Sequence, residues 1–285
     1  KRALERGLHP KEATYAVLKG EFDLDIPIGS RFSLETLNYV AVERIAKGQY
    51  KMQCETIGTA GNTLFGTLIP IEYIRGLSQA ELTELLIPGE DEEGTEQFRH
   101  RYFDSLHSQA FGGNIADYRE KVNGISGVGG VKVYPAWDGG GTVKLVIINS
   151  EYGIPSNELI QAVKDVIDPD SNTGAGYGLA PIGHTVTVEG AVEERISFMS
   201  NIVYQAGYSF ERCREDIFQA IDAYLHELNM AWQDDVQTVV RGSRIEGRLL
   251  DIEGIVDVYD TKINGSPGNH VLSSGSIAIR GDISG

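Results

Sequence analysis

Apolar and polar residues alternate along the first third of the chain in the pattern of half-buried β-strands. Tyr50, Met52 and Cys54 are separated by single polar residues, and this period of two places one side chain in the core and the next outside it. Glycines interrupt residues 12–87 at intervals typical of strands and turns. The pattern predicts a β-rich N-terminal domain over residues 1–88.

The hydrophobic pattern changes after Pro88 and Gly89, which precede the acidic run Glu90–Glu93. From about residue 95 to 107, apolar side chains recur at every fourth position, at Phe98, Tyr102 and Leu106. This spacing gives one apolar stripe on a helix, and acidic residues near its start interact favourably with the helix dipole. We therefore expect a domain boundary at Pro88 and Gly89 and a helix soon after it.

The middle of the chain combines helical and strand patterns. Asn114 is the expected N-cap of a short helix, and Gly124 is expected to end it. Two strands that form a hairpin and a third helix follow, at residues 131–135, 142–149 and about 155–168. The order helix, strand, strand, helix predicts a compact α+β domain over residues 89–183.

The last third of the chain has a similar pattern. Strands are expected at residues 186–188, 196–204, 255–263 and 276–280. A long helix is expected after Ser209, and the spacing of Ser243 and Glu246 is that of a capping box, which predicts the start of a shorter helix. These elements predict a C-terminal α+β domain over residues 184–285.

Two short segments of the chain resemble each other. Residues 125–128 and 252–255 both have isoleucine first, glycine third and a β-branched residue fourth, and each follows a helix and precedes a strand. Two α+β units of similar layout are therefore expected. The whole pattern predicts an α+β, multi-domain fold, in which a β-rich N-terminal domain precedes two small α+β domains with helices packed on short, mostly antiparallel sheets.

The charge balance argues against a nucleic-acid partner. The chain has 25 Lys and Arg residues against 41 Asp and Glu residues, so its formal net charge is −16, and such a surface repels phosphate backbones. The longest apolar runs are short, as in Val143–Ile148, so no membrane span is expected. Cys54 and Cys213 are too few for a disulfide framework, which favours synthesis in a reducing cytoplasm.

The sequence offers no convincing metal site. His226 and Glu227 begin a zinc-protease pattern, but Met230 stands where the second histidine is required. Asp168 begins a calcium-loop pattern, in which Leu179 occupies the position of the bidentate carboxylate. We therefore expect no bound metal.

Cofactor and catalytic motifs are missing from the sequence as well. Gly127, Gly129 and Gly130 lead into a strand instead of a helix N-terminus, so they do not form a dinucleotide fingerprint. The chain contains no P-loop and no nucleophile elbow. Pairs of catalytic carboxylates stay open as an alternative, because the many acidic residues offer several. We expect no cofactor and no catalytic residues, which favours a structural or binding role.

Several spaced motifs resemble those of one known family. The most specific ones are the acidic segment 89–93, the helical segment 98–102, the Phe-Gly-Gly-Asn string within 110–118, and the strand segment 128–135. Further matches lie at 28–32, 58–62 and 180–186, and the resemblance is weaker after about residue 190. Together these motifs resemble the baseplate J-like family of contractile phage tails, over nearly the whole chain.

The resemblance implies a non-enzymatic wedge protein in the tail baseplate of a virion. Such a protein helps to form a ring around the hub and spike, and it takes part in the rearrangement that triggers sheath contraction. Its implied partners are other wedge proteins, a second copy of itself, and hub and sheath-initiating proteins. The resemblance also implies a helical segment upstream of Lys1, so we expect the numbered chain to begin inside a longer protein made in the cytoplasm of a bacterial host.

Domains joined by short linkers can rotate as rigid bodies while their interfaces exchange partners, so linkers such as 87–89 and 181–183 are candidate hinges or interfaces. The candidate residues are Pro88, Gly89, Glu90, Asp91, Glu92, Glu93, Phe111, Gly112, Gly113, Asn114, Pro181 and Gly183. The acidic run among them has two interpretations. It is either a solvated helix entrance or a surface that binds a basic partner.

Two other functions stay open at this point. One is a tail-associated glycan-binding or glycan-hydrolysing module, which needs a cleft with paired carboxylates or stacked aromatic rings. Trp137 and Trp232 are the tryptophans that could line such a cleft. The other is the related wedge protein of a bacterial secretion or bacteriocin apparatus, which uses the same mechanics.

Overall fold

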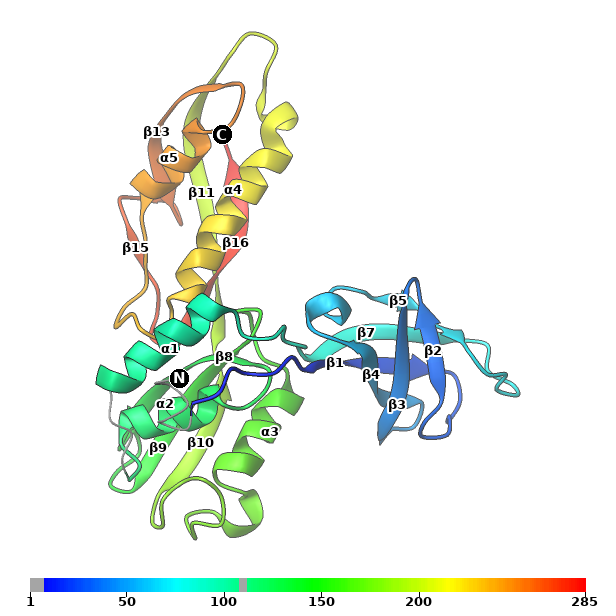
Figure 1. The fold of residues 1–285 in the computed structure, drawn as a ribbon. Coiled ribbons are helices and arrows are strands. Elements are labelled where there is room, and N and C mark those ends of the chain that lie inside the picture. The colour runs from blue at the N-terminus through cyan, green and yellow to red at the C-terminus, as the bar shows by residue number, and fades with distance from the viewer. Residues whose placement is uncertain (1–7, 108–111) are drawn as a thin grey trace. The chain divides into compact units, whose positions relative to one another are not determined.

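The computed structural model describes residues 8–107 and 112–285, without the side chains of residues 104–107. The chain forms two compact units. The first comprises the residues up to Glu151 together with Pro155–Gly190, and the second comprises Tyr152–Ile154 together with Ala191–Gly285. Figure 1 shows the elements of both units coloured along the chain. The predicted α+β fold class is confirmed.

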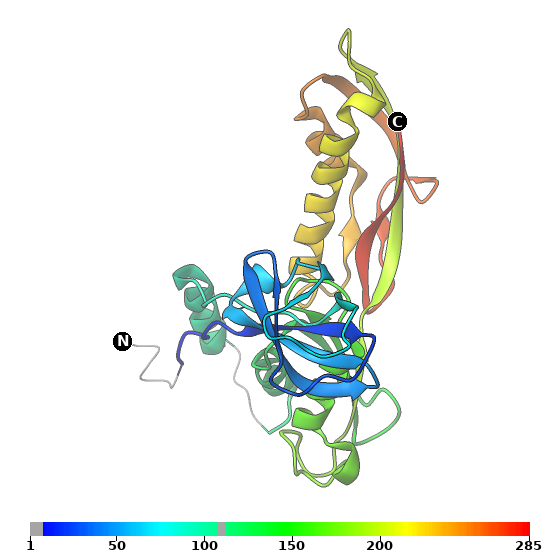
Figure 2. The same cartoon turned by 90° about the vertical axis from the view of Figure 1, so that its right-hand side faces the viewer.

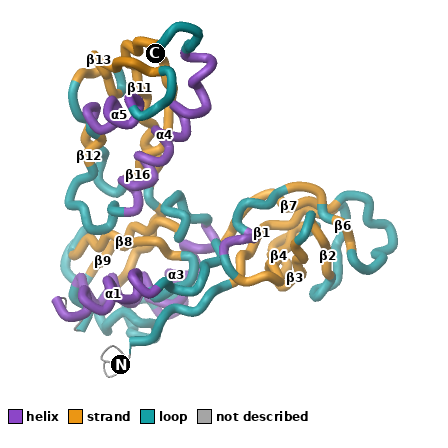
Figure 3. Tube along the Cα trace, turned by 45° about the horizontal axis from the view of Figure 1, so that its top comes forward, coloured by secondary structure: helices purple, strands orange, loops and turns teal. Residues whose placement is uncertain are grey.

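The N-terminal part of the first unit is a seven-stranded sheet with the order β5-β7-β1-β4-β3-β2-β6. Its strands are β1 (Tyr15–Phe22), β2 (Arg31–Leu34), β3 (Leu37–Ala46), β4 (Gln49–Ile57), β5 (Gly66–Thr67), β6 (Ile69–Pro70) and β7 (Ala80–Ile87). Because β5 and β6 are separated only by the buried Leu68, one short segment pairs with both β7 and β2 and nearly closes the sheet (Figure 3).

The alternation predicted for β4 is confirmed in this sheet. Tyr50, Met52 and Cys54 are buried, and the polar residues between them are partly exposed. Pro70 lies in the short strand β6 next to β2, a position that suits proline because β6 pairs through only two residues.

The rest of the first unit is a three-stranded sheet with helices. Its elements are α1 (Thr95–His107), α2 (Ile115–Asn123), β8 (Val128–Pro135), β9 (Thr142–Asn149), α3 (Asn157–Ile167), the short helix η3 (Asp170–Asn172) and β10 (Thr185–Gly190). β9 is central, antiparallel to β8 and parallel to β10. The buried face of this sheet packs against α2 and α3 through Tyr118, Val122, Leu159 and Val163.

The predicted helix starts in this part are confirmed. The Asn114 side chain accepts a hydrogen bond from the Asp117 amide at 2.8 Å, and Gly124 ends α2. Ser156 caps α3 in the same way by accepting from the Leu159 amide at 3.1 Å. The apolar stripe expected on α1 ends at Leu106, whose side chain lies outside the described residues.

The segment Pro181–Gly183 forms a tight turn before β10. The Gly183 amide donates to the Gly174 carbonyl at 2.9 Å, and the His184 amide donates to the Pro181 carbonyl at 3.0 Å. β10 then pairs with β9 along its whole length. Residues 185–190 therefore belong to the sheet of the first unit, although the predicted C-terminal domain starts at residue 184. The division into three domains stays a prediction.

The second unit has a four-stranded sheet with the order β14-β13-β11-β16. Its elements are β11 (Val192–Tyr204), α4 (Phe210–Met230), β12 (Val239–Val240), α5 (Gly242–Leu250), β13 (Ile255–Ile263), β14 (Ser266–Pro267), β15 (His270–Val271) and β16 (Ser276–Ser284). β11 is antiparallel to β13 and parallel to β16. Figure 2 shows α4 running along one face of this sheet, and the core contains residues of both α4 and α5.

The helix predicted near Ser243 exists, but the predicted capping box is wrong. Arg241 occupies the N-cap position, and no side chain caps the helix there. The carboxylate of Glu246 instead accepts a weak hydrogen bond from the Thr261 amide of β13 at 3.4 Å. Glu246 therefore connects α5 to the sheet and does not cap the helix.

The repeated sequence segment corresponds to a repeated turn. Gly127 and Gly254 both have left-handed backbone angles, with φ of 85° and 91°, directly before β8 and β13. The carbonyl of Gly127 accepts from the Ser150 amide at 2.8 Å, and that of Gly254 accepts from the Gln205 amide at 2.9 Å. In both units this turn places a helix before a strand that is antiparallel to the central strand of the sheet.

Candidate functional site

The candidate residues Pro88 and Gly89 are buried. We call residues 88–93, together with the groups that bind them, the junction. The Asn62 side chain accepts from the Gly89 amide at 2.8 Å and donates to the Gly89 carbonyl at 3.0 Å. The side-chain nitrogen Nδ2 of Asn62 also donates to the carboxylate of Glu151. Asn62 is 4% exposed, so it supplies both backbone partners of Gly89 in the interior of the protein.

Only glycine fits at position 89. A Cβ atom there would lie 2.3 Å from the Gly58 carbonyl oxygen and 2.7 Å from the Ala16 amide nitrogen. Both neighbours are backbone atoms, which cannot rotate away as a side chain can. The junction is therefore packed against β1 and the turn that follows β4.

The acidic residues after Gly89 also have partners inside the protein. The Glu90 carboxylate accepts from the Gly127 amide at 2.6 Å. The Asp91 carboxylate accepts from the amide and from the hydroxyl of Thr59, each at 3.0 Å, at the start of the short helix η2 (Thr59–Gly61). Glu90 thus links the junction to the turn before β8, and Asp91 links it to the β-rich part.

Glu93 forms a bidentate ion pair with Arg101 of α1. The two nitrogen–oxygen distances are 2.8 and 2.6 Å, and the Lys11 amide donates to the same carboxylate at 3.0 Å. The hydrogen bond from Arg101 outweighs burial and lowers the pKa of Glu93 below its ordinary value. Asp91 and Glu92 are exposed, and three residues of the acidic run, Glu90, Asp91 and Glu93, serve internal contacts.

The structure brings together two candidate segments that are far apart in sequence. A Cβ atom at Gly113 would lie 2.5 Å from Cγ of Pro181, so the residues around 112–114 contact the turn at 181–183. His184 follows that turn, and its Nδ1 atom lies 2.8 Å from the hydroxyl of Tyr118. The two rings are stacked with centroids 6.0 Å apart. The candidate residue Phe111 lies outside the described residues.

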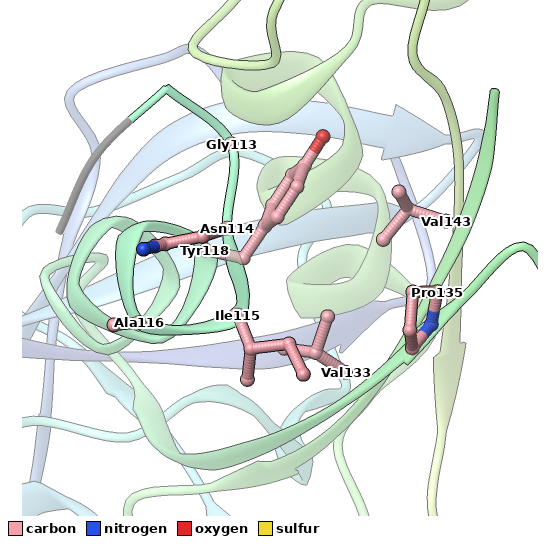
Figure 4. Close-up of a pocket in the computed structure, with 8 residues that line it drawn as sticks. All are labelled: Gly113, Asn114, Ile115, Ala116, Tyr118, Val133, Pro135 and Val143. Atoms are coloured by element: carbon pink, nitrogen blue, oxygen red, sulfur yellow. The ribbon is translucent and has the colours of Figure 1, made fainter.

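A shallow groove of about 450 Å³ lies beside this contact. Its lining residues come from the start of α2 and from the hairpin strands: Gly113, Asn114, Ile115, Ala116, Tyr118, Val133, Pro135 and Val143 (Figure 4). Most of these side chains are apolar, and Ile115 is 48% exposed. Burial raises the pKa of Tyr118 to about 12, so its hydroxyl keeps its proton near neutral pH. The groove can therefore receive an apolar side chain, and none of its described lining residues carries a carboxylate or a thiol.

The sequence positions that suggested chemistry have structural roles. The carboxylate of Asp168 accepts from the Gly174 and Val186 amides, both at 2.9 Å, and pairs with Lys164 at 3.0 Å. Burial alone would raise the pKa of Asp168, but these contacts outweigh it and lower the pKa. Among the described residues, no group of three His, Cys, Asp or Glu side chains is arranged to hold a metal ion.

The two tryptophans differ in exposure. Trp232 is fully buried, and its indole nitrogen donates to the Ser276 carbonyl at 2.8 Å. Trp137 is 44% exposed, and the Lys144 ammonium lies 4.9 Å from its ring centroid. Trp232 therefore cannot stack on a glycan from solvent.

In the described part of the chain, no helix has both the length and the hydropathy needed to cross a bilayer.

Residues that the sequence did not single out for a role complete these sites. Asn62, Tyr118, Glu151 and His184 were not expected to act in the junction or the groove. Asn62 and His184 lie within segments that resemble the family, but this resemblance does not say which residues they contact. Their roles depend on contacts between positions distant in the chain, such as the 89 positions between Asn62 and Glu151.

Two family models match the chain. The Baseplate J-like central domain matches residues 110–190, and the Baseplate J-like protein C-terminal domain matches residues 196–285. These matches cover the three-stranded sheet of the first unit and most of the second unit. They identify the chain as a structural component of a phage-type tail baseplate.

Relatives extend the similarity to nearly the full length. The chain is 37% identical over 287 residues to the phage-like element PBSX protein XkdT of Bacillus subtilis, which covers 99% of this chain and 79% of that protein. It is 36% identical, with the same coverage, to the uncharacterized protein YqbT of the same organism. The chain belongs to the baseplate J-like family.

More distant similarities are also found. Baseplate protein gp47 of Escherichia phage Mu is 28% identical over 177 residues, which is 57% of this chain and 48% of that protein. A chain in the cryo-EM structure of the anti-feeding prophage baseplate has a TM-score of 0.47 and 10% sequence identity, with coverage of 99% of this chain and 80% of that chain.

Proposed function

We propose that this chain is a wedge protein of a contractile tail baseplate, located in the virion or phage-like particle after synthesis in the bacterial cytoplasm. It helps to form the ring around the hub and spike and takes part in the rearrangement that triggers sheath contraction. The observation that carries this proposal is the 37% identity to the PBSX protein XkdT over nearly the whole chain.

The proposed partners are other wedge proteins, a second copy of this chain, and hub and sheath-initiating proteins. The groove beside α2 supports a role in such contacts, because it is open and its described lining residues are mostly apolar. The candidate residues Gly113 and Asn114 line this groove, and Pro181 contacts Gly113. We propose the groove as one of the surfaces through which the baseplate assembles.

We also propose that the chain is not an enzyme. The Asp168 carboxylate, the buried thiols of Cys54 and Cys213, and the Glu93 ion pair all serve internal contacts or the core. Burial raises the pKa of the Cys54 thiol, which works against a reactive thiolate. The role as a hinge or interface of the residues 88–93 stays a proposal within this mechanical function.

The proposal is tested by co-expression with the products of neighbouring tail genes. A wedge protein forms a discrete complex of fixed stoichiometry, which light scattering after size exclusion measures. Ile115→Glu places a charge in the groove and is expected to weaken that complex, while Glu72→Gln, at an exposed position outside the groove and outside the candidate residues, serves as a control. Failure to form any complex with tail proteins would contradict the proposal.

A further inference from the structure

The hairpin loop between β8 and β9 carries an exposed tryptophan. Trp137 is 44% exposed, whereas Trp232 of the second unit is fully buried. An indole ring has a large apolar surface, and tryptophans are enriched where one side of the ring meets a partner and the other meets water. Trp137 contributes nothing to the hydrophobic core of the first unit, so its place on the surface calls for another role.

The backbone around Trp137 is held by hydrogen bonds within the hairpin. The Ala136 amide donates to the Thr142 carbonyl at 2.7 Å, and the Thr142 hydroxyl donates to the Gly139 carbonyl at 2.7 Å. The Asp138 amide donates to the same hydroxyl at 3.0 Å. The loop therefore presents the ring in one defined conformation before a ligand binds, which lowers the entropic cost of binding.

A lysine of β9 lies over the indole ring. The Lys144 ammonium is 4.9 Å from the ring centroid of Trp137 and 5.7 Å from that of Tyr134. Tyr134 and Lys144 are paired across β8 and β9, so their side chains share one face of the sheet. Cation–π contacts of this kind hold the ammonium near both rings. Two aromatic side chains and a cation therefore lie together at this end of the hairpin.

A carboxylate of the neighbouring strand completes this group of side chains. Glu189 of β10 lies 3.5 Å from the Lys144 ammonium, and its side chain is 48% exposed. This distance is longer than that of a tight charge-assisted hydrogen bond, so the ammonium can still donate to a ligand and the carboxylate can still accept from one. We call Tyr134, Trp137, Lys144 and Glu189 the aromatic platform.

An exposed indole beside a hydrogen-bond donor and an acceptor suits a sugar. A pyranose whose substituents are all equatorial has a flat face of axial C–H groups, which packs on the electron-rich face of an aromatic ring. Its hydroxyls both donate and accept hydrogen bonds, and Lys144 and Glu189 supply the matching groups. A neutral sugar is favoured over an anionic one, because the net charge of −16 repels anions.

We propose that the aromatic platform binds a neutral, β-linked glycan of glucose or N-acetylglucosamine units. One pyranose ring stacks on Trp137, and Lys144 and Glu189 bind its hydroxyls. A protein segment matches the platform less well, because lysine and glutamate are depleted at the centres of protein interfaces. Glycan binding is a further function beside the proposed mechanical role and does not depend on it.

NMR spectroscopy of the 285-residue chain with cellotetraose and with chitotetraose tests the proposal. The chain has two indole N–H signals, and at least one of the sugars is expected to shift that of Trp137, at a Kd of about 1 mM, while that of Trp232 stays fixed. Saturation transfer to the sugar should show binding at least about tenfold weaker for Trp137→Ala and about threefold weaker for Trp137→Phe, which keeps an aromatic ring. Tyr73→Ala removes an 88% exposed ring from the β-rich part and should leave the affinity unchanged.

Three results would overturn the proposal. The first is a Trp137 signal that responds to neither sugar, including the case in which it responds to a proline-rich peptide instead. The second is unchanged sugar binding by Trp137→Ala, and the third is an equal loss of binding by Tyr73→Ala, with circular dichroism showing both variants folded. None of these results concerns incorporation into tail particles, which tests the proposed function independently.

Discussion

At the scale of single residues, the contacts that hold the junction together are polar and mostly buried. Asn62 satisfies both backbone groups of Gly89, and Glu93 binds Arg101 and the Lys11 amide. Removing one partner of a buried hydrogen bond lowers the free energy of unfolding by more than the bond contributes, because the remaining group has no hydrogen-bond partner from water or protein. The junction is therefore sensitive to changes that would be tolerated in an exposed linker.

Asn62→Ala is expected to destabilise the protein. The change removes both partners of Gly89 in the interior, and the expected loss in the free energy of unfolding is about 2 kcal/mol. Chemical denaturation measures it. Asn172→Ala, at an exposed position of the same unit, is the matched control and should change the stability by less than about 0.5 kcal/mol. Equal stability of the two variants would contradict the account of the junction.

Gly89→Ala is expected to have a larger effect. The new methyl group would lie 2.3 Å from the Gly58 carbonyl oxygen, so the backbone has to move, at an expected cost of about 3 kcal/mol. The thermal midpoint of unfolding provides the measurement. Gly140→Ala has open space at its Cβ position and should leave the midpoint nearly unchanged. A midpoint for Gly89→Ala like that of the control would show that the junction is not packed as described.

The Glu93–Arg101 pair predicts a defined pH dependence. Because the pKa of Glu93 in the folded protein lies below its ordinary value of 4.5, the pair stabilises the fold above that pH. Its contribution is lost as the pH falls through the lower, folded pKa. Glu93→Gln is expected to be less stable than the unchanged chain by about 1 kcal/mol at pH 7, and the difference should disappear in acid. Glu92→Gln, which alters an exposed neighbour, should show no such pH-dependent difference.

At the scale of elements, local signals in the sequence predicted the bounds of helices and strands. They did not predict the contacts between residues that are far apart in the chain. Asn114 and Gly124 marked the ends of α2, and the strand patterns found β9 and β13 at their observed bounds, because caps and alternation depend on neighbouring residues. The pairing of β10 with β9 depends on residues about 40 positions apart, so the sequence pattern did not show it. Pro181–Gly183 was therefore a candidate linker in the sequence, and the structure shows a turn that leads into β10. The same limit explains why Asn62 was not expected in the junction and why Glu246 was mistaken for a cap.

Side chains of α4 and of the segment after it bind the free backbone groups of the edge strand β16. Asn229 of α4 accepts from the Ala278 amide at 3.0 Å and donates to its carbonyl at 2.9 Å, and the indole of Trp232 binds the Ser276 carbonyl. These side chains replace the hydrogen bonds of a neighbouring strand. An uncovered edge would be open to pairing with other chains.

Asn229→Leu is therefore expected to expose the edge of β16. Two buried backbone groups of Ala278 lose their partners, so the expected loss of stability is about 2 kcal/mol, with increased aggregation on heating. Differential scanning calorimetry with light scattering follows both effects. Met230→Leu, at the neighbouring exposed position, is the control. An unchanged transition for Asn229→Leu would refute the protective role.

At the scale of the whole molecule, the described residues include a surface suited to contacts with other proteins. Hydrogen bonds connect the β-rich part of the first unit to the junction, and Glu90 connects the junction to the turn before β8. The groove is mostly apolar, whereas the chain as a whole is strongly acidic. These features agree with membership of the baseplate J-like family and with the proposed mechanical role.

Electron microscopy of tail particles assembled with a labelled copy of this chain tests the central claim most directly. The account predicts that the label appears in the baseplate, at the end of the tail around the hub, and that particles made without the chain lack an organised baseplate. A label elsewhere on the particle, or complete contractile tails in the absence of the chain, would contradict the account.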